Sequence, residues 1–185
     1  MSSGRSNKLA GQIGEYLVCA ELGRRGFIAT PFSGNVPTFD VLATDELCRT
    51  VPIQVKATRS DKWPSDARTW MNIEFDRDTG VQRCLRATPI SNPELIYVCV
   101  TIASPGAPVG RDRFFVLTMA DLQKVCMEGY ARWMDKHQWK RPRSPESYDC
   151  RYEVGEISQF EDKWDLIIHR LRSSAPDRSL VPGDG

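Results

Sequence analysis

The stretch FDVLATDELCRTVPIQVKATR, residues 39–59, decides the predicted fold. It has the pattern of two apolar β-strands, over 38–45 and 50–58, joined by a polar turn. Each strand carries polar side chains where a core strand would carry aliphatic ones: Asp40 in the first, and Gln54 and Lys56 in the second. An acid, an amide and an ammonium inside such a hairpin call for a physical explanation.

The alternation of side chains along a strand indicates where these polar groups lie. Gln54 and Lys56 point to one face of their strand, and Ile53 and Val55 point to the other. If the two strands pair as neighbours, Asp40 can converge on the same place. Because an unpaired buried charge is costly, these groups must be satisfied by one another or by an ion.

A helix predicted over residues 7–25 adds a fourth polar group. Ser6 or Asn7 can cap its start, and Gly26 is a natural stop. One side of the helix carries the apolar stripe Leu9, Ile13, Tyr16, Leu17 and Ala20. The opposite side, also mostly apolar, carries Gly11, Glu15, Val18, Cys19 and Leu22. The helix is therefore predicted to be buried on both sides, with Glu15 in the middle of its second buried face.

The rest of the chain predicts further strands and helices around this hairpin. Strands are expected over 27–32, 94–102 and 113–118, and a strand pair within 71–90, whereas 59–70 is polar and predicted to be an irregular excursion. The run 94–102 is apolar throughout, which is typical of a central strand covered on both faces. Helices are predicted over 119–139, after a capping box of Thr118 and Asp121, and within 156–172. We expect a single α/β domain over residues 1–172 and a disordered tail over 173–185.

Composition narrows the possible partners. The 185 residues are 41% hydrophobic and 26% charged with a formal net charge of +1, so nucleic acid or membrane would have to be met by a local patch. The six cysteines include no C-x-x-C pair, which argues against a zinc site or a disulfide framework. The N-terminus has no apolar signal region and no run has the length of a membrane span. We expect no membrane partner and a cytoplasmic location.

Two carboxylates, an amide oxygen and a lysine are hard ligands beside a positive charge, which suits Mg²⁺ or Mn²⁺. At these residues the sequence resembles the PD-(D/E)xK nuclease superfamily, whose members carry an acid on a helix, an acid on the second strand and an (E/Q)-x-K triplet on the third. Here GQIGEYLVCAEL supplies Glu15, TFDVLA supplies Asp40, and IQVKA supplies Gln54 and Lys56. The resemblance covers residues 7–60 and is nearest to Q-x-K branches found in some restriction endonucleases and resolvase-like proteins. It implies a restriction-endonuclease-like α/β/α sandwich with a central mixed sheet.

The resemblance also implies a chemistry, the Mg²⁺- or Mn²⁺-dependent endonucleolytic hydrolysis of phosphodiester bonds, most simply in DNA. Asp40 would be the main metal ligand, Gln54 would offer its side-chain oxygen, and Glu15 would hold a water of the ion or a second ion. Lys56 would orient the attacking water or stabilise the charge of the phosphorane. The superfamily's commoner residue at position 54 is glutamate, so the amide removes one negative charge and should weaken metal affinity.

Other interpretations stay open at this point. Asp40 could pair with Lys56 as a structural ion pair in a plain cytoplasmic domain. The chain could also be a weak or inactive nuclease-fold module that binds nucleic acid or a protein partner. Many enzymes of the superfamily form homodimers to cut two strands, but the sequence shows no interface signature.

Candidate nucleic-acid contacts lie in two basic segments. Arg59 and Lys62 follow the Q-x-K strand and are placed to touch a backbone near the cleaved phosphate. The segment 132–143 interleaves cationic and aromatic residues, a combination that suits phosphate contacts and base stacking, although a charge run at a helix end is usually a solvated surface. Its candidates are Lys140, Arg141 and Arg143.

Overall fold

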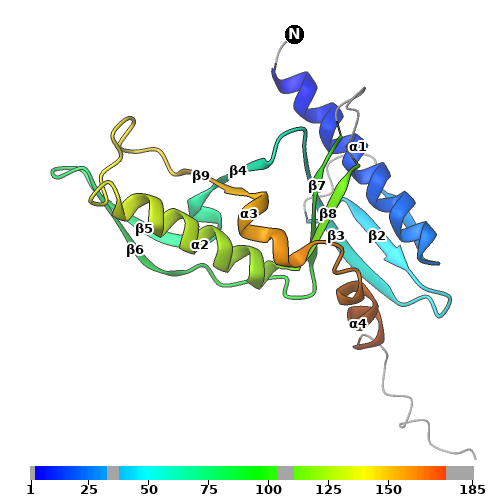
Figure 1. The fold of residues 1–185 in the computed structure, drawn as a ribbon. Coiled ribbons are helices and arrows are strands. Elements are labelled where there is room, and N and C mark those ends of the chain that lie inside the picture. Colours follow the sequence, from blue (N-terminus) through cyan, green and yellow to red (C-terminus); the bar gives the residue numbers. More distant parts are fainter. Residues whose placement is uncertain (1–2, 33–37, 104–110, 174–185) are drawn as a thin grey trace, which may run out of the picture.

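The computed structural model describes residues 3–32, 38–103 and 111–173, and its centre is a mixed five-stranded sheet flanked by helices (Figure 1). The strands, in spatial order, are β1 (Ile28–Pro31), β2 (Val41–Thr44), β3 (Thr50–Thr58), β7 (Ile96–Thr101) and β8 (Arg113–Thr118). β1, β2 and β3 are successively antiparallel, β3 and β7 are parallel, and β7 and β8 are antiparallel. The predicted α/β fold with a central mixed sheet is confirmed.

β7 is buried along its whole length, as its apolar sequence predicts, because both faces of the sheet are covered. On one face Ile96, Val98 and Val100 pack in a cluster with residues of α1 (Ser3–Arg24) and α4 (Asp165–Ser173). On the other face Tyr97 and Cys99 pack with residues of α2 (Met119–Asp135). The hydrophobic core is thus divided into two clusters by the sheet.

Helix α1 is buried on one side only, so the prediction of a helix with two buried faces is wrong. Leu9 and Tyr16, both in the predicted apolar stripe, are 52% and 58% exposed. The buried positions recur every four residues, and the first two are small: they are Ala10, Gly14, Val18 and Leu22. A Cβ atom on Gly14 would lie 2.4 Å from the Cβ of Ala57 in β3, so the small residues allow a close approach that a larger stripe would prevent.

The two ends of α1 compare differently with the sequence prediction. The helix begins at Ser3, so Ser6 and Asn7 lie inside its first turns instead of capping it. Gly26 has a φ of +85°, a left-handed conformation that favours glycine, and the predicted stop is confirmed.

A second lobe beside the sheet carries two strand pairs (Figure 1). β5 (Met71–Asp76) pairs with β6 (Val81–Ala87), which confirms the strand pair predicted within 71–90. β4 (Lys62–Asp66) pairs with β9 (Asp149–Glu153), although 59–70 was predicted to be irregular and β9 was not predicted. The prediction failed because β4 and β9 each bury one residue, Trp63 and Tyr152. These two are register partners whose rings stack at 5.4 Å.

Helix α2 is shorter than predicted. The capping box of Thr118 and Asp121 is confirmed, but α2 ends at Asp135, and Gln138 and Trp139 then adopt positive φ angles of 54° and 60°. The helix predicted within 156–172 is confirmed by α4, and α3 (Val154–Ile157) and a 3₁₀ turn (Ser158–Phe160) lie before it.

The described residues end at Ser173, the last residue of α4, so the remainder of the predicted tail, 174–185, lies outside them. Within 3–32, 38–103 and 111–173, no helix combines the length and the apolar character that crossing a membrane requires.

Candidate active site

Asp40 lies directly before β2 and stabilises an edge of β3 that β2 does not reach. Val41 is the register partner of Ile53, and the Asp40 N–H donates to the Ile53 carbonyl oxygen at 2.9 Å. β3 continues beyond this level to Thr58. The next β3 amide on this side, the Val55 N–H, donates to Asp40 Oδ2 at 2.8 Å. A side chain thus takes the place of a strand, and the carboxylate is fixed at a notch in the sheet.

Gln54 also forms a hydrogen bond with the Asp40 carboxylate. Its Nε2 also donates to Asp40 Oδ2, as expected if the two strands are neighbours. An ionised glutamate at this position would have no proton to donate and would face Asp40 as a second acceptor. The amide therefore satisfies Asp40 without help from a cation. Both hydrogen bonds end on Oδ2, and within the described residues no donor bonds to Asp40 Oδ1.

Lys56 shares a strand face with Gln54, but its side chain is exposed and forms no salt bridge with Asp40 in the described parts of the chain. In the parallel register Gln54 lies beside Tyr97, and Lys56 lies beside Cys99. Burial raises the pKa of the Cys99 thiol to about 12, and the Lys56 ammonium opposes that rise. The interpretation of Asp40 and Lys56 as a structural ion pair is therefore wrong, and the lysine charge is available to a ligand.

Glu15 reaches this notch from α1. Its side chain is half-buried, on the flank of the helix instead of the middle of a buried face. Burial raises the pKa of the Glu15 carboxyl, and the negative charge of Asp40 raises it further. Gly14 holds this turn of the helix against β3, at Ala57 and Val55. The close contact of α1 with the sheet is what brings the second carboxylate into the electrostatic range of the first.

The oxygen atoms at the notch fit a hard divalent cation. Asp40 Oδ1, the Gln54 side-chain oxygen and the Glu15 carboxylate are ligand types that Mg²⁺ and Mn²⁺ accept. Burial is the larger cause of the raised pKa of Glu15, and the negative charge of Asp40 is the smaller cause, which a cation would compensate. No cluster of three His, Cys, Asp or Glu side chains suited to a metal occurs in the described ranges. A site here would therefore depend on two carboxylates and the amide.

A groove of about 440 Å³ begins at Lys56 and runs between the start of α1 and the β3–β4 turn. Ser6 and Asn7 line it from the helix, and Arg59, Ser60 and Pro64 line it from the turn and β4. The base of the groove is held in place by the buried Trp63, which donates its Nε1–H to the Lys56 carbonyl oxygen at 2.8 Å. Sequence reasoning found Arg59 but not Ser6 or Asn7, because it treated both as helix caps.

The other predicted nucleic-acid contacts are dispersed. Lys62 lies on β4 and pairs with Glu153 of β9 at 2.8 Å. Lys140, Arg141 and Arg143 follow α2 in the second lobe, and none of them lines the groove at Lys56. The structure thus brings together Arg59 and Lys56, but places the second basic segment elsewhere.

No family model and no curated protein sequence match this chain. Two solved structures are similar to it over most of their length. One is a bacterial homing endonuclease, I-Ssp6803I, with 13% identity and a TM-score of 0.49 over 91% of this chain and 97% of that chain. The other is Hjc, a Holliday junction resolvase of Archaeoglobus fulgidus, with 15% identity and a TM-score of 0.38 over 80% of this chain and 88% of that chain.

Proposed function

We propose that this chain is a divalent-metal-dependent nuclease of the PD-(D/E)xK type that hydrolyses phosphodiester bonds in DNA. The observation that supports it is the arrangement at the notch. Asp40 is held by Gln54 and the Val55 amide, Glu15 lies within its electrostatic range, and Lys56 is exposed on the same strand face as Gln54.

Asp40, Gln54 and Glu15 would hold Mg²⁺ or Mn²⁺ through their free oxygens. The bound ion supplies the charge that polarises a phosphoryl group and makes a water molecule more acidic. Asp40 is suited to this role because its Oδ2 is already fixed by two hydrogen bonds. Its Oδ1 therefore needs no reorientation.

The remaining steps belong to side chains of the chain. Lys56 stabilises the negative charge that develops on the phosphoryl oxygens, because its ammonium is exposed and not neutralised by a carboxylate among the described residues. Glu15 accepts a hydrogen bond from the attacking water and orients it. Arg59 and the hydroxyl and amide groups of the groove bind the backbone next to the cleaved bond.

A second candidate function is a nuclease-fold module that binds nucleic acid or a protein partner without cutting. One observation favours it: the Gln54 amide and the Val55 N–H both donate to Asp40 Oδ2, so the protein itself holds this carboxylate in place. A binding module would use such hydrogen bonds to keep the notch in shape.

DNA cleavage in the presence of Mg²⁺ and of Mn²⁺ distinguishes these functions. Wild type is expected to cut, and Asp40→Ala and Lys56→Ala are expected to lose at least about a hundredfold in rate, the scale of removing one preorganised electrostatic group. Unchanged cleavage in both variants would exclude the notch as the active site. DNA binding without cleavage in the wild type would favour the binding module.

Assembly and compartment are further parts of the proposal. A homodimer would present two notches to the two strands of a duplex, and sedimentation of the protein with and without DNA measures it. All six cysteines are free thiols, which matches the reducing cytoplasm. Localisation of the tagged protein in cells tests that compartment.

A further inference from the structure

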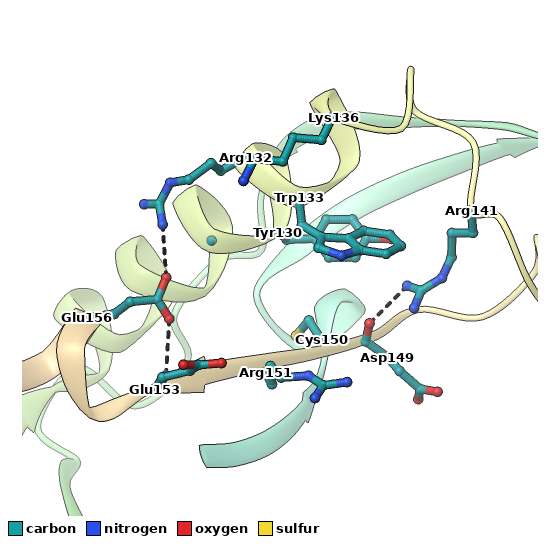
Figure 2. Close-up of a pocket in the computed structure, with 11 residues that line it drawn as sticks. Tyr130, Arg132, Trp133, Lys136, Arg141, Asp149, Cys150, Arg151, Glu153 and Glu156 are labelled. Carbon is teal, nitrogen blue, oxygen red and sulfur yellow. Dashed lines mark hydrogen bonds and ion pairs between the residues drawn. The ribbon is translucent and has the colours of Figure 1, made fainter. Parts of the chain in front are cut away.

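A second hollow, of about 650 Å³, lies between α2 and β9 in the second lobe, away from Asp40 (Figure 2). Cationic side chains line it from three segments. They are Arg132 of α2, Lys136 and Arg141 of the segment after α2, and Arg151 of β9. Trp133 lies among them and is 39% exposed, which is unusual for so large an apolar side chain.

The acidic residues of this pocket neutralise only part of the positive charge. Glu156 pairs with Arg132 at 3.1 Å, and Glu153 pairs with Lys62 at 2.8 Å, outside the pocket. No salt bridge within the described residues engages Lys136, Arg141 or Arg151. The pocket therefore keeps an excess of positive charge.

Arg141 and Arg151 have no carboxylate partner in the described part of the chain. Arg141 donates to the main-chain oxygen of Asp149 at 2.9 Å, and its guanidinium lies 4.9 Å from the centre of the Trp133 ring. Its Nε–H is buried without an acceptor. Figure 2 shows the Asp149 carboxylate directed away from this guanidinium. Arg141 thus has hydrogen-bonding capacity that the protein does not use.

Unpaired cations around an exposed indole form a chemical combination that recognises nucleotides. Phosphate groups are attracted by lysine and arginine, and bases stack on aromatic rings regardless of sequence. Arg141 and the His137 ring, whose centroid lies 4.4 Å from that of Trp133, already contact the indole, so a base would stack on the part of the ring that remains exposed. A ligand that offers an apolar ring alone would leave three cations unused.

The pocket is joined to the groove at Lys56 by one face of the β4–β9 ribbon. Pro64 of β4 lines that groove, and its register partner on β9 is Arg151, which lines the pocket. Directly opposite residues of an antiparallel pair project from the same face. A strand of nucleic acid lying on that face would run from Lys56 to the pocket.

We propose that the α2–β9 pocket is a second nucleic-acid site, which binds two backbone phosphates, one with Lys136 and one with Arg151 on opposite sides of the pocket (Figure 2), and stacks a base on Trp133. The choice of a nucleic-acid strand over a free nucleotide rests on the function proposed above, since the two ligands share this chemistry. The pocket would hold a part of the substrate away from the cleaved bond.

The direct test is the affinity for a fluorescently labelled DNA single strand, measured by anisotropy in EDTA over a range of salt concentrations. The double variant Lys136→Ala/Arg151→Ala is expected to bind about tenfold more weakly, and the slope of log affinity against log salt should fall by roughly 1.4, because each phosphate contact with a single strand contributes about 0.7. The matched control is Lys163→Ala/Arg172→Ala, which removes two exposed cations at α4, on the other side of the sheet. Equal affinity and slope in the two double variants would overturn the proposal.

Two further experiments distinguish a nucleic-acid strand from a free nucleotide as the ligand, and binding at the pocket from nuclease activity at the notch. Trp133→Leu is expected to weaken binding of the single strand about tenfold, the scale of one lost base stack. If dAMP binds wild type and DNA does not displace it, the ligand is a free nucleotide and the proposal is overturned. If wild type does not cut DNA but the Lys136→Ala/Arg151→Ala variant still loses affinity for DNA, the proposed binding site is supported and the proposed nuclease function is refuted. Circular dichroism of each variant checks that it is folded.

Discussion

At the scale of single residues, Gln54 decides how the notch behaves without metal. Its amide and the Val55 N–H both donate to Asp40 Oδ2, so the protein itself stabilises one oxygen of the carboxylate. The glutamate usual at this position in the resembled superfamily would depend on a cation to offset two facing acids. Gln54 therefore favours a stable metal-free site over tight metal binding.

Gln54→Glu tests this role of the amide. In EDTA the variant should be less stable than wild type by about 1–3 kcal/mol, because it loses a donor and gains a like charge beside Asp40. Excess Mg²⁺ should then raise its melting temperature more than that of wild type, since the site has gained a ligand charge. Thermal unfolding with EDTA and with Mg²⁺ measures both effects. An equal response to Mg²⁺ in the two proteins would argue against a metal at Gln54.

Glu15 gives the notch a dependence on pH. Burial and the charge of Asp40 raise its pKa above the ordinary value of 4.5, so the folded protein binds a proton more readily than the unfolded chain. Ionisation of Glu15 therefore costs stability, which should fall as pH rises from about 4.5 through the folded-state pKa. Glu15→Gln is expected to be more stable than wild type at neutral pH and equal to it below the unfolded pKa. Urea unfolding at both pH values checks this sign, and a variant less stable at neutral pH would contradict it.

The contact of Asp40 with Gln54 could be predicted from the sequence, whereas the lack of a salt bridge between Lys56 and Asp40 in the described residues could not. Alternation and the short turn between the strands indicate which side chains share a face, and the structure joins these two by a hydrogen bond. Whether Lys56 meets Asp40 depends on side-chain reach, which alternation does not specify. Glu15 was found because it is an acid in an apolar helix, but its position on the flank depends on which side of the helix is buried.

At the scale of elements, α1 is positioned by its smallest residues. The sequence prediction buried both sides of the helix, but Leu9 and Tyr16 of one side are exposed, whereas Val18 and Leu22 of the other side are buried. The prediction of β3 and β8 agreed with the structure at both ends, because both strands are rich in β-branched or aromatic residues. The hydrophobic pattern of a strand indicates where the strand begins and ends. A helix that packs closely on a sheet needs small residues at the contact, and hydrophobicity alone does not indicate them.

Gly14→Ala tests the close contact between α1 and β3. The new Cβ would lie 2.4 Å from Ala57 Cβ, so the helix must move, at a cost of about 1–3 kcal/mol in the free energy of unfolding. Cleavage should fall as well, because Glu15 moves with the helix. Gly11→Ala is the matched control, since its Cβ would meet nothing within 4 Å and the helix should gain about 0.5–1 kcal/mol. Similar stability changes in both variants, measured by urea unfolding, would refute the contact as the cause.

At the scale of the whole molecule, the second lobe completes the site that the sheet begins. Trp63 of β4 is 2% exposed, stacks on Tyr152 of β9 and bonds to the Lys56 carbonyl oxygen of β3. The sequence did not predict this ribbon, because β4 contains Pro64 and is mostly polar, as edge strands can be. Its stability comes from a partner, β9, that is distant in the sequence and equally polar.

Trp63→Phe tests whether this ribbon supports Lys56. The variant keeps a buried ring but loses the hydrogen bond, so stability should fall by about 1 kcal/mol and DNA cleavage should fall with it. Trp70→Phe is the control, because it loses a comparable bond, from Nε1 to Ser65 Oγ at 2.7 Å, away from Lys56. Trp70→Phe should lose similar stability and keep its cleavage rate. Equal cleavage rates in the two variants would show that the β4–β9 ribbon does not support the active site.

The central claim is that Asp40 anchors a divalent-metal site, and calorimetric titration of Mn²⁺ into wild type and Asp40→Asn tests it most directly. Asparagine keeps the shape of the side chain and an acceptor for the Val55 amide but removes the charge. Mn²⁺ is expected to bind wild type and to show no measurable binding to Asp40→Asn, with both proteins folded by circular dichroism. Equal Mn²⁺ affinity in the two proteins would contradict the claim.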